Sequence, residues 1–326
     1  MPGAATPFKP LWIDRADADA ILQDKLASGR VAPALGERLA FLIKNGYVII
    51  PGAITHGLAD QLLAEMAAVT AQPEKFIARR DRAAYAHPTA EVVNDVTFRI
   101  IDFHVNSRHA GKAIYCDAIA QVLDAVFEAP ANAFQCLTFK HGSQQRMHQD
   151  GAYVVVSEPL QFMASWIALE DVTPGSGELM YYAGSHRLDD FLFGDERAKA
   201  WTPAVHGREI HARFLDSIVE RSEAAGLPRE SFLPKKGDAL IWASDLVHGG
   251  TRMKNDNTRR SIVTHYCPVN VAPKFSTFTD YFHLRKVAPR GYISSRHYDL
   301  RRGKRWLARD YPVLKPKFMG GSETQA

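Results

Sequence analysis

The chain changes its pattern near residue 132, and this change most limits the folds that it can adopt. From there to about residue 270, short β-rich runs alternate with turn signals such as Thr173-Pro-Gly-Ser-Gly and Lys236-Gly-Asp. Short strands without alternating helices favour a barrel or a double-sheet jelly roll over a Rossmann sheet. We expect strands at Phe134–Lys140, Met147–Val156, Met163–Val172, Leu179–Ala183, Ala239–Ala243 and Ser261–Val269.

The first 130 residues have a helical pattern instead. Apolar residues spaced three or four apart predict helices, and Asn45-Gly46 is predicted to end the second of them. A short strand is expected to follow at Tyr47–Pro51. The helices are expected at residues 16–26, 34–44, about 57–69 and about 113–127.

We therefore expect a single catalytic domain over residues 1–326, with a mainly β fold and added helices. Its parts would be a mostly helical N-terminal part (1–130), a jelly-roll core (132–270) and a basic C-terminal segment (271–326). Residues 187–233 are long, charged and partly helical, which predicts an insertion within the core. A long insertion of this kind is often functional, such as a lid, but it can equally decorate an edge.

The composition is that of a soluble globular protein, with 46% hydrophobic and 23% charged residues. Three cysteines, Cys116, Cys136 and Cys267, are odd in number and lack metal or redox spacing, so we expect reduced thiols in a cytoplasmic protein. The N-terminus does not resemble a signal peptide, and no apolar stretch approaches the roughly 20 residues of a membrane span. We expect no nucleic-acid partner, and an oligomer stays possible.

The net charge of +4 is unevenly distributed along the chain. Residues 281–326 contain 11 Lys and Arg against 3 acids, a net of +8, so the other 280 residues carry −4. A basic segment on a slightly acidic body is expected to attract an anionic partner, and the hypothesis is that the substrate is this anion. The alternative is a solvated or structural segment without a binding role.

His148-Gln149-Asp150 and the distant His248 suggest a metal site. Residues i and i+2 of a strand point to the same face, so His148 and Asp150 would lie side by side. His248, at the end of another strand-like run and followed by two glycines, would add a second imidazole. Two histidines and one carboxylate with an open face are the ligands of non-haem Fe(II) oxygenases. A lone histidine in an apolar run is more often a core residue, and only the combination favours the metal.

Arg259 follows His248 by eleven residues and enters another predicted strand. Its planar fork can bind a carboxylate through two parallel hydrogen bonds, which suits the distal carboxylate of 2-oxoglutarate. Arg260 would then face the other way, because adjacent residues of a strand point to opposite faces. The alternative is a basic pair on the surface.

Several motifs in this order resemble the phytanoyl-CoA dioxygenase family of Fe(II)/2-oxoglutarate-dependent oxygenases. The resemblance extends from about residue 42 to residue 267 and includes an N-terminal stretch at Phe41–Pro51. The other motifs are His148-Gln-Asp, Trp166-Ile-Ala-Leu-Glu-Asp, Gly177-Glu-Leu-Met-Tyr-Tyr-Ala-Gly-Ser-His, Gly237-Asp leading to His248-Gly, and Arg259-Arg-Ser-Ile.

The resemblance implies a double-stranded β-helix (jelly roll) with N-terminal helices. It assigns His148, Asp150 and His248 to iron and Arg259 to 2-oxoglutarate, with Trp166 lining the co-substrate pocket and Gln135 touching the co-substrate near the iron. The chain departs from the family at Gly250, where a serine often helps to hold 2-oxoglutarate. Either Thr251 replaces that hydroxyl or the hydrogen bond is missing.

The implied reaction consumes O2 and 2-oxoglutarate, releases succinate and CO2, and hydroxylates an unactivated C–H bond of a small molecule or lipid-like substrate. Asp150 favours oxidation over halogenation, since related halogenases lack this carboxylate. Desaturation, epimerisation and ring formation stay open. So do an inactive jelly-roll binding protein and a cupin-type metal isomerase, although the isomerase would have no use for Arg259.

Overall fold

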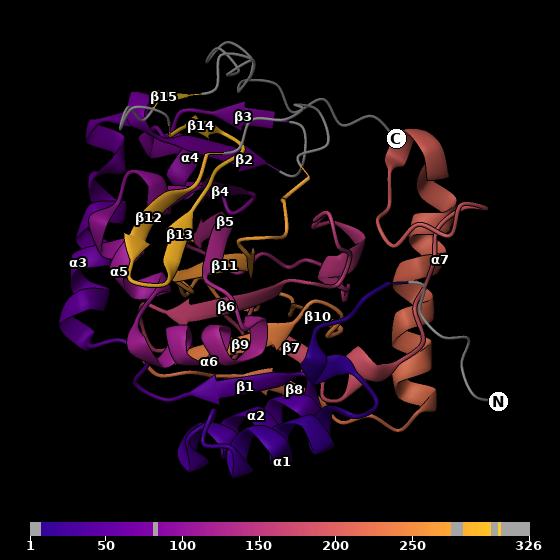
Figure 1. The fold of residues 1–326 in the computed structure, drawn as a ribbon. Helices are drawn as coiled ribbons and strands as arrows, with labels where there is room; N and C mark the ends of the chain where they lie inside the picture. Colours follow the sequence, from indigo (N-terminus) through magenta and orange to yellow (C-terminus); the bar gives the residue numbers. More distant parts are fainter. Residues whose placement is uncertain (1–7, 81–83, 275–282, 301–305, 308–326) are drawn as a thin grey trace.

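A large sheet forms the centre of the molecule (Figure 1). The computed structural model describes residues 8–80, 84–274, 283–300 and 306–307. The main path of the large sheet is antiparallel and runs β1 (Tyr47–Ile50), β9 (Ala239–Ala243), β6 (Met163–Ala168), β11 (Ser261–Pro268), β5 (Ala131–Phe139), β4 (Phe98–Ile101), β2 (Ile77–Arg80) and β3 (Ala84–Ala86).

A smaller antiparallel sheet faces the large one and consists of β10 (His248–Gly250), β7 (Leu179–Tyr182) and β8 (Arg229–Phe232). Side chains from the two sheets meet between them. Trp166 of β6 packs edge-on against Phe232 of β8, with ring centroids 5.6 Å apart. Tyr47 of β1 lies 4.3 Å from Tyr181 of β7. Two facing sheets that share a core are the jelly-roll arrangement, so the predicted fold class is confirmed.

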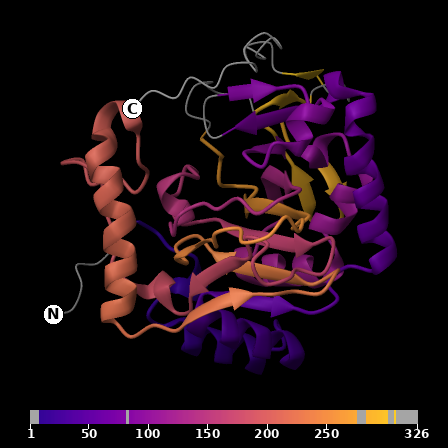
Figure 2. The same cartoon turned by 180° about the vertical axis from the view of Figure 1, so that it is seen from behind.

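Helices cover the side of the large sheet that faces away from the small one (Figures 1 and 2). Helix α6 shows why: Ile119, Val122, Leu123 and Val126 recur three or four residues apart and are buried. Full burial of each such side chain stabilises the fold by roughly 1.5–3 kcal/mol. The helices are α1 (Ala18–Ala27), α2 (Pro33–Asn45), α3 (His56–Ala67), α4 (Ala90–Asn94), α5 (Arg108–Ile114) and α6 (Asp117–Phe127).

The sequence located the first three helices within a few residues. Gly46 ends α2 as predicted, in the left-handed conformation with φ 78°. A Cβ there would lie 2.4 Å from Nδ1 of His186, so the position needs glycine for two reasons. The predicted continuous helix over 113–127 was wrong, because the chain breaks between α5 and α6. At the break, the Tyr115 hydroxyl bonds the backbone of the sheet, and Cys116 is extended.

Five of the six strands predicted beyond residue 132 are present; one has the predicted bounds, and the bounds of the other four differ by one to four residues. The predicted strand Met147–Val156 was wrong: His148 and Val156 each make an isolated bridge, to His248 and Pro273, and a 3-10 turn lies between them at Asp150–Ala152. No pattern in the sequence predicted β2, β3 and β4, which extend the large sheet within the part that we expected to be mostly helical.

The predicted insertion contains the long helix α7 (Pro203–Ala224), which stands at one side of the molecule and is interrupted at Gly207 (Figure 1). The end of this range is not an insertion, because β8 pairs with β7 in the small sheet. In the basic segment, β12 (Arg285–Ala288) and β13 (Gly291–Ile293) form a hairpin, and β13 pairs in parallel with β5.

Two further short strands, β14 (Tyr298–Asp299) and β15 (Trp306–Leu307), pair with each other. Cys116, Cys136 and Cys267 form no disulfide, and two of them are buried. Among the helices of the described ranges, none combines the length and apolarity that a bilayer span requires.

Candidate active site

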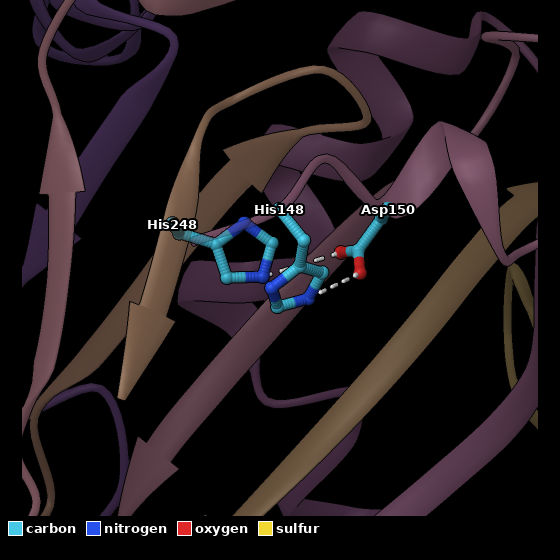
Figure 3. A group of neighbouring side chains, drawn as sticks. All are labelled: His148, Asp150 and His248. Carbon is cyan, nitrogen blue, oxygen red and sulfur yellow. Dashed lines mark ion pairs between the residues drawn. The ribbon is translucent and has the colours of Figure 1, made fainter. Parts of the chain in front are cut away.

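Three side chains meet between the two sheets, from segments a hundred residues apart (Figure 3). His148 and His248 are joined by a pair of backbone hydrogen bonds of 2.8 and 2.9 Å, which bring their rings together. Nε2 of His148 lies 3.6 Å from Oδ1 of Asp150, and Nε2 of His248 lies 3.7 Å from Oδ2. One ligand atom from each of the three residues lies within 4.8 Å of the others, and all three residues are buried.

The local reason for this arrangement differs from the one predicted. Asp150 begins a 3-10 turn and does not continue a strand. Gln149, between the two ligands, has an extended backbone (φ −111°, ψ 134°). Across one extended residue, the side chains of His148 and Asp150 still point to the same side, as they would in a strand. The Gln149 amide donates a 2.8 Å hydrogen bond to the carbonyl of Asp245, which holds the extended residue in place.

Each of the three side chains is oriented by a hydrogen bond. Nδ1 of His148 lies 2.8 Å from the Arg146 carbonyl, and Nδ1 of His248 lies 2.9 Å from the Leu246 carbonyl. A carbonyl only accepts, so Nδ1 carries the proton and Nε2 keeps a lone pair for a metal. Burial lowers the pKa of His248 to about 4, which keeps that ring neutral at neutral pH.

Asp150 is held by two residues that sequence reasoning missed. The Trp242 indole donates a 2.9 Å hydrogen bond to Oδ2, and Nε2 of His265 lies 3.3 Å from the same oxygen. Burial opposes ionisation of Asp150, but the nearby histidines His248 and His265 hold its pKa well below the usual range. The sequence did contain an indication of His265. Alternate residues of a strand face the same side, so Val263 and His265 are expected on the same side as Arg259.

Arg259 lies in the same pocket as the three ligands, and Arg260 does not. Nη1 of Arg259 donates to the Gly177 carbonyl at 2.5 Å, and the guanidinium lies 5.6 Å from the Trp166 ring. Burial lowers its pKa to about 10, so it stays charged at neutral pH. Arg260 points outward and pairs with Glu170 at 3.1 Å.

Two polar atoms at this end of the pocket are buried without a hydrogen-bond partner in the described structure. They are Nε of Arg259 and Nε1 of Trp166. A buried donor without a partner is costly, so such donors at one place need an explanation. A carboxylate placed against the guanidinium would accept from Nε.

Two residues that the sequence assigned to the co-substrate, Gln135 and Thr251, do not line the pocket of the metal ligands. Gln135 lines a neighbouring pocket with Phe134 and Tyr153, where β5 bulges against β11. Thr251 does not line the pocket of the three ligands, and its buried hydroxyl has no partner in the described structure. Gly250 does line that pocket, and a Cβ on it would lie 3.0 Å from the Gln144 nitrogen. A side chain at the family's serine position would therefore press against this backbone.

A model of the phytanoyl-CoA dioxygenase (PhyH) family matches residues 42–261, which is most of the chain. The chain therefore belongs to the phytanoyl-CoA dioxygenase family. A comparison with curated protein sequences finds no match.

Solved structures with a similar fold are enzymes of varied chemistry. The epimerase SnoN, in complex with Fe3+, alpha ketoglutarate and nogalamycin RO, is 21% identical with a TM-score of 0.56, covering 80% of this chain and 98% of SnoN. The carbocyclase SnoK from nogalamycin biosynthesis is 17% identical (TM-score 0.56; 77% and 89% covered). EctD from S. alaskensis with bound Fe is 16% identical (TM-score 0.54; 74% and 79% covered). At these identities the likeness establishes the fold.

The residues present fit Fe(II), with 2-oxoglutarate and O2 as co-substrates. Two imidazoles and one carboxylate are the donor set that non-haem Fe(II) takes in such enzymes. The buried guanidinium of Arg259, with its unsatisfied Nε, fits a carboxylate in the same pocket.

Proposed function

We propose that this protein is an Fe(II)- and 2-oxoglutarate-dependent dioxygenase that hydroxylates an unactivated C–H bond of a small anionic molecule. The observation that carries the proposal is the single pocket lined by His148, Asp150, His248 and Arg259. An inactive binding protein or a metal isomerase would have no use for a buried arginine opposite a complete ligand set. Asp150 favours hydroxylation over halogenation.

The residues of the pocket would divide the work. His148, Asp150 and His248 would hold iron on one face, and Trp242 and His265 would keep the Asp150 carboxylate in place. Arg259 would bind the distal carboxylate of 2-oxoglutarate, with Trp166 packed beside it. The bound iron and co-substrates supply the oxidising chemistry, while the protein supplies orientation and a pocket shielded from water.

The neighbouring pocket supports an anionic substrate. Lys274 and Arg296 line it together with Gln135 and Tyr153, and the one acid in its lining, Asp102, is paired with His297. The Tyr153 ring lies 5.6 Å from the His148 ring, so this pocket is next to the metal ligands. Two cations near a cleft raise the local concentration of an anionic ligand.

Residues of the basic segment line this pocket, and the insertion contacts Tyr153, which also lines it. His297 donates from Nδ1 to buried Asp102 at 2.8 Å, which fixes the neighbouring Arg296 beside the pocket. From α7, His211 bonds the Tyr153 hydroxyl at 2.7 Å. The remaining basic cluster, Arg301, Arg302, Lys304 and Arg305, lies outside the described residues. Three free thiols also support a cytoplasmic location.

A succinate-release screen tests the proposed function, with sugar phosphates, acyl-CoA thioesters and anionic lipids beside neutral analogues. We expect succinate release above the uncoupled rate with an anionic compound, falling as salt is added, and a product heavier by one oxygen atom. A product lighter by two hydrogens would show that the enzyme desaturates its substrate, and a product of unchanged mass would show that it isomerises it; either would contradict hydroxylation. Stimulation only by neutral compounds would refute the anionic substrate.

A further inference from the structure

A second cavity lies on the opposite face of the large sheet, between α3, α4 and strands β4 and β5. Its volume is about 340 Å³, within the usual range for ligand sites. Leu63 and Met66 line it from α3, Val93 from α4 and Phe98 from β4. We call it the outer cavity.

The sheet register explains why this face is hollow. Ala78, Ile100 and Thr138 are paired neighbours on β2, β4 and β5, and all three line the outer cavity. Two of these side chains are small, so the sheet surface recedes there below the level of the helices. Protein interiors are close-packed, so an apolar recess of this size is a feature that a ligand would fill.

Three cations line the outer cavity: Arg99 of β4, Lys140 directly after β5 and Arg260 directly before β11. Arg80 of β2, which pairs with Phe98, lies outside the lining. Arg80 is neutralised by Asp95 and Arg260 by Glu170. Lys140 instead bonds the neutral amide of Asn94, so its positive charge is not balanced by that partner.

The outer cavity is separate from the active site. Successive residues of β5 point to opposite faces, and Leu137 and Phe139 line the pocket of the metal ligands while Thr138 and Lys140 line the outer cavity. The sheet therefore lies between the two sites, and Arg99 of β4 is the one lining residue that they share.

We propose that the outer cavity binds a medium-chain fatty acid, with its chain among Leu63, Met66, Val93 and Phe98 and its carboxylate at Lys140. The apolar lining excludes a sugar or nucleotide, since either would bury many hydroxyls without partners. All the charged residues that line the cavity are basic, which excludes a cationic amphiphile. The head group is therefore anionic and the body apolar.

The test is calorimetric titration of decanoate into the full-length protein, kept anaerobic and saturated with Fe(II) and 2-oxoglutarate so that the active-site pocket is occupied. We expect one decanoate site, and at least tenfold weaker binding of decanol, because a charge-assisted hydrogen bond is lost. Ala67→Trp fills the cavity from an exposed position on α3, and Lys140→Gln removes the charge. Each should weaken decanoate binding at least tenfold.

The matched control is Lys235→Gln, at a lysine whose side chain is 79% exposed and which does not line the cavity. It should bind decanoate as the wild type does. Circular dichroism would show that the variants are folded. No decanoate binding to the wild type, or equal binding by Ala67→Trp and the wild type, would overturn the proposal. So would binding that occurs only when 2-oxoglutarate is omitted, because the fatty acid would then occupy the catalytic pocket.

Discussion

The two ends of the active-site pocket differ in how their polar groups are satisfied. At the metal end, both histidines bond backbone carbonyls through Nδ1, and Asp150 accepts from Trp242. At the arginine end, Arg259 bonds the protein through Nη1 only, while its Nε and the indole nitrogen of Trp166 have no partner in the described structure.

This difference indicates what each end is built to bind. The metal end is preorganised by the protein alone, which suits an ion that needs fixed ligand directions. The arginine end keeps its donors for a partner that brings its own acceptors, as a dicarboxylate does. Substitutions that act on one end and spare the other can test this division.

The largest effect is expected at the metal end. In His248→Ala, Fe(II) affinity should fall by more than about a hundredfold. This exceeds the loss expected when a residue that only hydrogen-bonds a metal ligand is removed. Succinate release should fall to background. Equilibrium Fe(II) binding and succinate assays measure this, with His56→Ala on the exposed start of α3 as the control. Full activity of His248→Ala would show that the three residues are not the metal site.

The next effect separates the two adjacent arginines. Arg259→Met should raise the KM for 2-oxoglutarate at least about tenfold, since a hydrogen bond to a charged group contributes roughly 1.5–3 kcal/mol. Fe(II) affinity should change little. Arg260→Met is the matched control, because its side chain pairs with Glu170 outside the pocket. The opposite pattern of KM values would contradict the assigned roles.

A smaller effect distinguishes two buried tryptophans. Trp242→Phe removes the hydrogen bond to Asp150 and should weaken Fe(II) binding about tenfold. This is the lower end of the range of losses expected when a residue that supports a metal ligand is replaced, because His265 still faces the same carboxylate oxygen. Trp166→Phe should leave Fe(II) affinity unchanged and alter only the KM for 2-oxoglutarate. If both variants changed Fe(II) affinity equally, the two ends would not be independent.

The smallest effect concerns Gly250, which lines the same pocket. A Cβ there would meet the Gln144 nitrogen at 3.0 Å, so Gly250→Ala should lower the free energy of unfolding by about 1 kcal/mol. Gly57→Ala on α3 is the control, because nothing lies within 4 Å of its added Cβ. That change should stabilise the protein slightly, by about 0.4–1 kcal/mol. Chemical denaturation would show whether the two signs are opposite.

The sequence predicted the strands whose composition is distinctive. Ala239–Ala243 is β9 with the bounds predicted, and β11 was located to within one residue. Strand β2 was missed because Ile77-Ala-Arg-Arg is short, ends in two arginines and lacks the apolar character of a buried strand. The predicted strand Met147–Val156 was wrong because the chain turns at Asp150, and apolar content alone does not report such a turn.

The three metal-site candidates were found because their spacing is visible in the sequence, and the structure brings them together. Trp242 and His265 were missed because their contact with Asp150 depends on which strands are neighbours. Trp242 pairs with Ala164 of β6, and Ala164 pairs with His265 of β11, so both rings reach the same carboxylate. That register is set by the packing of the whole sheet.

Anaerobic titration of Fe(II) and 2-oxoglutarate into the purified protein tests most directly whether one pocket binds both. A weak visible absorption band, typical of iron chelated by a 2-oxo acid, should appear only when both are present and saturate at one equivalent of each. Arg259→Met should need more 2-oxoglutarate to reach the same band, and Arg260→Met should not. Tight Fe(II) binding with no band at saturating 2-oxoglutarate would show that the pocket does not bring the two together.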